Sequence, residues 1–402
     1  MKLLYALESI RTPLLDTILG AVTHMGGELF FMVIAVTVFW CVSKRMGYYL
    51  MTVGFFGTIL NQFLKILCCV PRPWVKNPDF TIVESARAEA TGYSFPSGHT
   101  QNAVATYGGI ARYTRRRWLR GVCIALTLVI CFSRMYLGVH TPLDVGVSFV
   151  IAAALVLLVY PLMEEADRRP RVLTAMIGVM VLCSAAFIVY LYLRGDTGTT
   201  AEDTANYVSA LQNAWKLTGA TLGMLAANIL DRRYIRFETQ AVWWAQIIKL
   251  VVGFGLLLAI RAGLKAPLIA LCGGAAEIAG GIRYLLVVLF VTLLSRQGQH
   301  NTSVIMELEL FRALKMQDTD VLRHLLQNAA LFVPLGVLLP LLHRSLRSVW
   351  WALLGGAALS TMIETTQLVL AVGQCDVNDI LTNALGAVLG YGVFWLFGRR
   401  ME

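Results

Sequence analysis

Three short polar stretches in the first 150 residues carry side chains that could act on a phosphate group. The first ends an apolar segment and contains Lys65 and, seven residues later, Arg72 between two prolines. Arginine offers a planar fork of donors that matches phosphate, and lysine adds a point charge. The alternative is that Lys65 only extends its ammonium group outward from the end of a helix.

The second stretch reads Pro-Ser-Gly-His at residues 96–99 and precedes an apolar segment that we expect to become helical at about Asn102. Ser97 and the amides of Gly98 and His99 would then lie at a helix start, where unpaired N–H groups bind anions. Glycine has no Cβ, so a ligand can approach its backbone closely. The alternative is an ordinary serine cap followed by an exposed histidine.

The third stretch contains Arg134, His140 and Asp144. His140 and Asp144 are four residues apart and share a face if Pro142 opens a helix. A carboxylate bonded to one imidazole nitrogen fixes the tautomer and leaves the other nitrogen free to attack. A purely structural hydrogen bond, or an aspartate that only caps the helix, explains the same pair.

Together these stretches supply the inventory of phosphoryl transfer, which needs cations for the phosphate oxygens, a nucleophile and an acid for the leaving group. No acidic cluster with metal-ligand spacing accompanies them, so we predict a reaction that needs no metal and no cofactor. The residues alone leave open which histidine attacks.

The elements that must position these groups are membrane helices. The chain has 402 residues, of which 57% are hydrophobic and 14% charged, well below the charged share of soluble domains. Apolar stretches of about 17–25 residues recur throughout, as spanning helices require, and we expect about 11–12 spans. Residues 3–22 fit either an interfacial helix or a weak first span.

The net charge of +10 is better explained by membrane orientation than by nucleic acid, which we exclude as a partner. The basic clusters fall on alternate connections, and positive connections stay in the cytoplasm. All three polar stretches then face the outer leaflet. The clusters lie at 43–45, 112–120, 164–171, 231–237, 343–347 and 399–400.

The three stretches, "KILCCVPRP", "PSGH" and "SRMYLGVHTPLD", resemble in order and spacing the motifs of the type 2 phosphatidic acid phosphatase superfamily. The resemblance covers residues 25–163 and implies a six-helix membrane core. It implies that His140 attacks phosphorus, that Asp144 orients it, and that His99 protonates the leaving oxygen and then activates water. The phosphate would be held by the remaining matched residues, which are Lys65, Arg72, Ser97, Gly98 and Arg134.

The last hundred residues hold a second group of polar side chains at one depth of the predicted helices. They would form either a second polar pocket or a set of interhelical hydrogen bonds, each worth about 1 kcal/mol. We interpret the spacing of Gly386 and Gly390 as a helix-packing motif. The polar residues are Asn328, Glu364, Gln367, Asp379 and Asn383.

This C-terminal region, about 283–398, is similar to the VanZ-like family in the stretches "NAALFVPLG", "STMIETTQ" and "DVNDILTNALGAVLGY". The resemblance implies a bacterial source and a cell-envelope context but supplies no mechanism. The segment between the two regions looks similar to extensions found on some bacterial members of the phosphatase superfamily.

We therefore predict an all-α polytopic bundle with a lipid phosphatase core at 1–170, a linking transmembrane region at 171–282 and a VanZ-like domain at 283–402. It would lie in the bacterial plasma membrane and hydrolyse a lipid phosphate or pyrophosphate at the outer leaflet through a phosphohistidine. The candidate substrates are undecaprenyl pyrophosphate, phosphatidic acid and phosphatidylglycerol phosphate. The alternatives are a phosphotransferase that uses the same site and a non-catalytic lipid-binding or transport protein.

Overall fold

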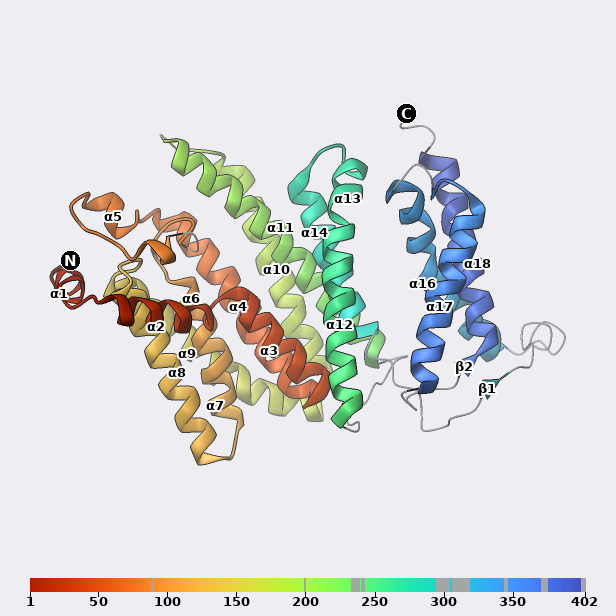
Figure 1. Cartoon of the computed structure of the whole chain (residues 1–402), viewed down its shortest axis with the longest axis horizontal. Helices are drawn as coiled ribbons and strands as arrows, with labels where there is room; N and C mark the ends of the chain where they lie inside the picture. Colours follow the sequence, from red (N-terminus) through yellow and green to blue (C-terminus); the bar gives the residue numbers. More distant parts are fainter. Residues whose placement is uncertain are drawn as a thin grey trace. The chain divides into compact units, whose positions relative to one another are not determined.

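The computed structural model describes residues 1–87, 90–198, 200–232, 239, 243–293, 304–305, 319–342, 346–369 and 375–398. Nearly all of these residues are helical (Figure 1), which confirms the predicted all-α class. The chain divides into two compact units, the first formed by Met1–Tyr234, Thr239–Gly253 and Ala275–Leu293, and the second by the remaining segments.

The first unit begins with α1 (Lys2–Ser9), α2 (Pro13–His24), α3 (Glu28–Cys41) and α4 (Lys44–Cys68), followed by the short α5 (Pro73–Lys76) and the 3₁₀ turn η1 (Glu84–Ala86). The path then continues through α6 (Gly98–Ala103), the π-helical segment η2 (Val104–Gly108), α7 (Gly109–Tyr113), α8 (Arg117–Tyr136) and α9 (Pro142–Arg168). The later helices are α10 (Arg171–Arg194), α11 (Ala201–Leu230), α12 (Trp243–Gly263), which runs on into the second unit, and α14 (Ala276–Leu293).

The second unit contains α13 (Lys265–Leu271), α16 (Thr319–Leu342), α17 (Val349–Val369) and α18 (Val377–Gly398). Two residue pairs, β1 (Val304–Ile305) and β2 (Cys375–Asp376), align in parallel. A Cβ on Gly386 would lie 1.9 Å from the Ala329 carbonyl oxygen, and one on Gly390 would lie 2.0 Å from that of Val333. Both glycines therefore let α18 and α16 approach closely, in agreement with the predicted packing motif.

Six helices of the described part are long and apolar enough to cross a membrane, or seven if the bent pair α2 and α3 is one span. This confirms a polytopic membrane protein. The eleven or twelve spans expected for the whole chain stay a prediction, because this count covers the described residues alone. The segments Leu325–Pro340 and Val349–Glu364 are shorter apolar helices.

The N-terminal residues 3–22 do not form one continuous helix. The chain breaks after α1, and Thr12 then caps α2 by accepting a hydrogen bond from the amide of Leu15, with Pro13 at the first helical position. The α2 helix meets α3 at an angle of 46°. Proline is favoured at a helix start because its missing N–H would be unpaired there anyway.

Four basic connections meet at one end of the first unit. Lys44 forms an ion pair with Asp231 at 3.0 Å, and Arg45 forms one with Asp167 at 2.9 Å. The guanidinium of Arg45 also lies 5.8 Å from the ring centre of Tyr113. The clusters at 43–45, 112–120, 164–171 and 231–232 are therefore neighbours, as the predicted alternation of connections requires.

The three polar stretches lie at helix ends of the first unit, and each end has a local cause. Helix α4 ends at Cys68 because Cys69 takes a left-handed conformation with φ 47°. Helix α9 starts at Pro142 with a reciprocal capping box between Thr141 and Asp144. Helix α6 starts at Gly98, four residues before the predicted Asn102, because the Ser97 cap precedes a polar first turn that the apolar pattern does not reveal.

Candidate active site

The three polar stretches meet in one buried cluster. One terminal nitrogen of Arg72 lies 3.0 Å from Nε2 of His140, and Nδ1 of His140 lies 3.6 Å from Oδ2 of Asp144. The amide of Ser97 donates to the carbonyl oxygen of Asp144 at 3.2 Å. These contacts join the segment between α4 and α5, the start of α6 and the start of α9. Lys65 and Arg134 are also buried.

The contact with Arg72 defines the protonation of His140. A guanidinium can only donate hydrogen bonds, so Nε2 of His140 must present its lone pair to Arg72, and a neutral ring then carries its proton on Nδ1. Burial and then the charge of Arg72 lower the pKa of the His140 imidazole well below its ordinary value, with smaller contributions from Arg134, Lys65 and His99. His140 is therefore neutral at pH 7 with a lone pair on the nitrogen that faces the cations.

Asp144 lies on the other side of the imidazole and is held by two donors. Ser94 Oγ donates to Oδ2 of Asp144 at 2.5 Å, and the Thr141 amide donates to the same oxygen at 2.8 Å. The 3.6 Å separation from His140 exceeds a normal hydrogen bond, and Nδ1 has no hydrogen-bond partner among the described residues. Asp144 thus both caps α9 and faces the protonated nitrogen, so the two interpretations of this residue are compatible.

The segment 91–94, which we call the strap, occupies the donors of the two cations from the first stretch. Arg72 donates from Nε to the carbonyl oxygen of Gly92 at 2.9 Å and from Nη2 to that of Thr91 at 2.7 Å. Lys65 donates to the carbonyl oxygen of Tyr93. Phosphate oxygens would use the same donors, so a ligand in this cluster must replace these carbonyl contacts.

The strap is anchored from the far side by α11. The hydroxyl of Tyr93 donates to Oδ1 of Asp203 at 2.7 Å. Burial, with the hydrogen bond to Asp203, raises the pKa of the Tyr93 phenol, which therefore remains a donor at neutral pH. Gly92 has φ +71°, a left-handed conformation that favours glycine and turns the strap towards Arg72.

The start of α6 leaves its backbone accessible. The side chain of Ser97 accepts a hydrogen bond from the Thr100 amide at 3.4 Å, as a helix cap does. A Cβ on Gly98 would meet only Oδ1 of Asn61, at 4.0 Å. Glycine is therefore not required here by protein packing. The space at the Cβ position of Gly98 is therefore open, and His99 follows in the first turn.

Arg134 reaches the cluster from the last turn of α8. It donates to Oγ1 of Thr23 at 2.7 Å, and its own carbonyl oxygen accepts the amides of Val139 and His140 at 3.2 and 3.3 Å. The residue that supplies a buried cation therefore also holds the backbone of His140 in place.

The predicted site residues of the first unit thus come together, but sequence reasoning missed three of their partners. Ser94, Thr23 and Tyr93 contact them from 50, 111 and 28 residues away along the chain, and Asp203 holds Tyr93 from a further 110 residues away. Separations of this size leave no periodic signal. The polar run at 91–94 beside the Pro-Ser-Gly-His turn is the one local signal that could have indicated the strap.

The second polar group forms hydrogen bonds between helices of the second unit. Asn328 on α16 donates to Asp379 on α18, and Asn383 on α18 donates to Ser360 on α17 at 2.8 Å. Glu364 is buried in α17, and Oδ1 of Asn383 is buried without a hydrogen-bond partner among the described residues. The side chain of Gln367 lies outside the described part. These contacts favour the set of interhelical hydrogen bonds over a second polar pocket.

No group of three His, Cys, Asp or Glu residues in the described ranges lies close enough together to hold a metal ion.

Comparison with known proteins assigns three regions. Residues 29–168 match the PAP2 superfamily, residues 215–295 match the transmembrane extension of PAP2 superfamily phosphatases, and residues 282–398 match VanZ/LLP1. No solved structure matches the chain.

The curated relatives are lipid phosphatases by name. The chain is 24% identical to sphingosine-1-phosphate phosphatase 1 of Mus musculus, over 60% of this chain and 57% of that protein. It is 28% identical to phosphatidylglycerophosphatase B of Bacillus subtilis (strain 168), over 40% and 80% of the two chains. It is 34% identical to undecaprenyl-diphosphatase BcrC of the same organism, over 27% and 54%.

The chain thus spans less than two thirds of the length of the mouse relative. Its first matched region contains all three polar stretches and the cluster that they form. Residues 29–168 are therefore a PAP2 superfamily domain, and the superfamily's transmembrane extension and a VanZ/LLP1 domain follow it in sequence.

Proposed function

We propose that this protein is a membrane phosphatase that removes phosphate from a lipid phosphate or pyrophosphate through a phosphohistidine at His140. The observation that carries the proposal is the pairing of His140 on both sides. Arg72 lies 3.0 Å from Nε2, and Asp144 lies 3.6 Å from Nδ1. A nucleophile must present a lone pair towards the bound phosphate, and this arrangement supplies one.

In the first step, the lone pair of His140 Nε2 forms a bond to phosphorus while the bond from phosphorus to the leaving oxygen breaks. His99 gives a proton to that oxygen, which leaves as a lipid alcohol or, from a pyrophosphate, as a lipid monophosphate. The phosphorylated imidazole carries positive charge on its ring, which the carboxylate of Asp144 stabilises from the Nδ1 side.

In the second step, His99 accepts a proton from water as the water oxygen attacks phosphorus. The P–N bond breaks, its electron pair returns to Nε2 of His140, and inorganic phosphate leaves. The transferring group carries its charge on three oxygens, which the cations and the amide of Gly98 would bind. The cations are Lys65, Arg72 and Arg134, with Ser97 beside them.

The substrate is proposed from the relatives and from the position of the cluster at helix ends. The names of the relatives include phosphatidylglycerophosphatase and undecaprenyl-diphosphatase. We propose undecaprenyl pyrophosphate first, because the VanZ/LLP1 region fits a cell-envelope context, followed by phosphatidic acid and phosphatidylglycerol phosphate. We place the site at the outer leaflet of a bacterial plasma membrane, since the basic connections gather at the other ends of the helices.

The experiment is phosphate release by the purified full-length protein with a panel of these three lipids. His140→Ala and His99→Ala should abolish release, whereas His24→Ala, a histidine exposed on α2, should retain it. Release by His140→Ala at the wild-type rate would refute the proposal. Added lipid alcohols separate the hydrolase from a phosphotransferase, because only the transferase yields a new phosphorylated lipid.

A non-catalytic lipid-binding or transport role predicts that cellular function survives the His140→Ala substitution. We also propose the division into a phosphatase core at 1–170, a linking region at 171–282 and a VanZ-like domain at 283–402. We assign metal-independent chemistry to the core, because two histidines and an aspartate supply the nucleophile, the acid and the orienting group.

A further inference from the structure

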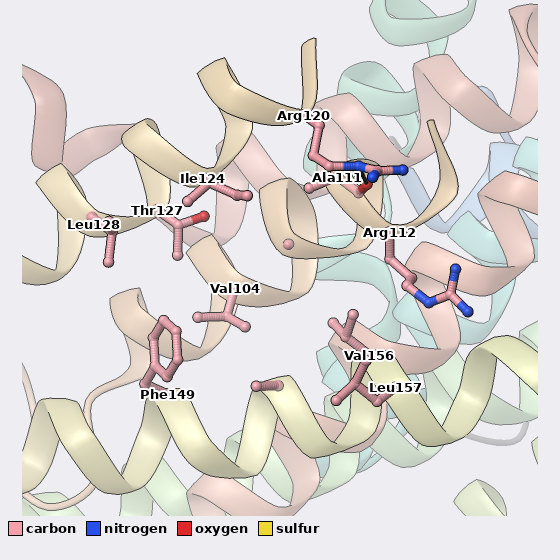
Figure 2. Close-up of a pocket in the computed structure, with 12 residues that line it drawn as sticks. Val104, Ala111, Arg112, Arg120, Ile124, Thr127, Leu128, Phe149, Val156 and Leu157 are labelled. Carbon is pink, nitrogen blue, oxygen red and sulfur yellow. Dashed lines mark hydrogen bonds between the residues drawn. The ribbon is translucent and has the colours of Figure 1, made fainter. Parts of the chain in front are cut away.

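A cavity of about 480 Å³ lies in the first unit, among the helical run α6–η2–α7, α8 and α9. This volume is within the range of small-molecule sites in proteins. Figure 2 shows apolar side chains along most of the cavity and two arginines together at one end. We call it the arginine groove. Its apolar walls include Val104, Ile124, Leu128, Phe149 and Leu157, and its cationic end is formed by Arg112 and Arg120.

The arginine groove is separate from the candidate active site. His99 lies in the first turn of α6 and Arg134 in the last turn of α8, whereas Arg112 lies at the end of α7 and Arg120 in the first turn of α8. The two sites therefore lie at opposite ends of the same helices. The arginine end coincides with the end where the basic connections meet.

The walls of the groove are open to the bilayer. The exposed fractions of Ile124, Leu128 and Leu157 are 48%, 55% and 60%, and these residues lie on helices that are long and apolar enough to span a membrane. Exposed apolar side chains at that depth contact lipid chains rather than water. An occupant that enters from the side is therefore a lipid rather than a water-soluble ligand.

The cationic end is held in place but keeps donors for a ligand. Arg120 donates from Nε to the carbonyl oxygen of Ala111 at 3.1 Å and from Nη2 to that of Thr114 at 2.9 Å, which fixes it across the α7–α8 turn. Arg112 stacks 3.8 Å from the ring centre of Tyr160. Within the described residues, it forms no ion pair or hydrogen bond that would use the edges of its guanidinium.

The charge of this end selects the headgroup. Residues 112–120 contain five arginines and no acidic residue, and arginine binds phosphate through two parallel hydrogen bonds. The length of wall from Arg120 to Leu128 is about 12 Å at the rise of an α-helix, enough for part of an acyl chain. Val104 and Gly108, which bound the π-helical segment η2, both line the groove, and such segments are frequent at functional sites.

We propose that the arginine groove binds one anionic phospholipid, with its phosphate at Arg112 and Arg120 and one acyl chain along the apolar walls. This lipid belongs to the leaflet opposite the candidate active site and is not the substrate.

The test measures, by native mass spectrometry, whether the purified full-length protein retains dioleoylphosphatidylglycerol in preference to dioleoylphosphatidylcholine. The wild type should retain one phosphatidylglycerol in preference to phosphatidylcholine. Arg112 is exposed and contacts the ring of Tyr160, so Arg112→Gln should leave the fold intact. The substitution should weaken retention about tenfold or more. Arg115→Gln removes the same charge from the same turn without changing the groove wall, and it should bind as the wild type does.

Ala153→Phe places a ring among the apolar walls and should prevent retention while all arginines remain. Equal retention of the two lipids by the wild type would overturn the proposal, because the groove would then hold ordinary boundary lipid. Wild-type retention by Arg112→Gln would overturn it independently, even if Ala153→Phe failed to fold.

Discussion

The Ser94→Ala substitution removes the shorter of the two hydrogen bonds that Oδ2 of Asp144 accepts, the one from Ser94 Oγ at 2.5 Å. Ser94 and Asp144 are almost fully buried, so water cannot easily replace the lost donor. The amide of Thr141 would remain as a donor to the same oxygen at 2.8 Å. Asp144 would then be freer to turn away from Nδ1 of His140, which it faces at 3.6 Å.

The magnitude follows from the charge of the acceptor. A hydrogen bond to a charged group contributes about 1.5–3 kcal/mol. If this stabilisation acts fully on the transition state, in which the His140 ring becomes positive, its loss lowers kcat about 10- to 150-fold. The KM should change little, because Ser94 contacts none of the cations that bind the phosphate.

The assay is inorganic phosphate release from short-chain phosphatidic acid in detergent micelles. Ser184→Ala is the matched control, since Ser184 is equally buried in α10 and donates to the carbonyl oxygen of Val181. Because Ser94 acts through Asp144, adding Ser94→Ala to an Asp144→Asn protein should cost less than about twofold. An undiminished kcat for Ser94→Ala, or its full effect in the Asp144→Asn background, would refute this reasoning.

Three further predictions concern pH, the strap and the second unit. Because burial and Arg72 lower the pKa of His140, its nucleophilic neutral form persists below its ordinary pKa of about 6.5. The acid limb of kcat/KM that belongs to His140 should therefore lie below pH 6.5, and a limb at or above 6.5 would contradict the assigned environment. Tyr93→Phe removes the donor to Asp203 that anchors the strap, so the strap carbonyls should leave Lys65 and Arg72 more easily and kcat/KM for phosphatidic acid should rise about fivefold, whereas unchanged kinetics would show that the anchor has no role. Gly386→Ala should destabilise the second unit by about 1–3 kcal/mol, measured by thermal unfolding in detergent. Gly392→Ala, where a Cβ meets nothing within 4 Å, should not, and equal melting temperatures would contradict the close packing.

Local spacing predicted those parts of the site that lie within one stretch. His140 and Asp144 are four residues apart beside a proline that opens a helix, so their proximity follows from helical geometry. The capping signal at Ser97 likewise predicted a helix start, although the apolar pattern placed the start four residues too late. The glycines of α18 were predicted because a spacing of four keeps them on one face.

Contacts between stretches could not be predicted in the same way. The contact of Arg72 with His140 joins residues 68 apart, and the contact of Arg134 with Thr23 joins residues 111 apart. Such contacts depend on how the helices pack, which no single segment encodes.

The most direct test of the central claim is to trap the covalent intermediate. The full-length protein would be mixed with phosphate-labelled phosphatidic acid, quenched within milliseconds, and mapped by mass spectrometry under neutral conditions that preserve phosphohistidine. We expect labelled phosphate on His140 in the wild type and no label in His140→Ala. In His99→Ala, the labelled intermediate should accumulate if the substitution slows the second step more than the first. Label on another residue, or lipid hydrolysis by His140→Ala at the wild-type rate, would contradict the assignment.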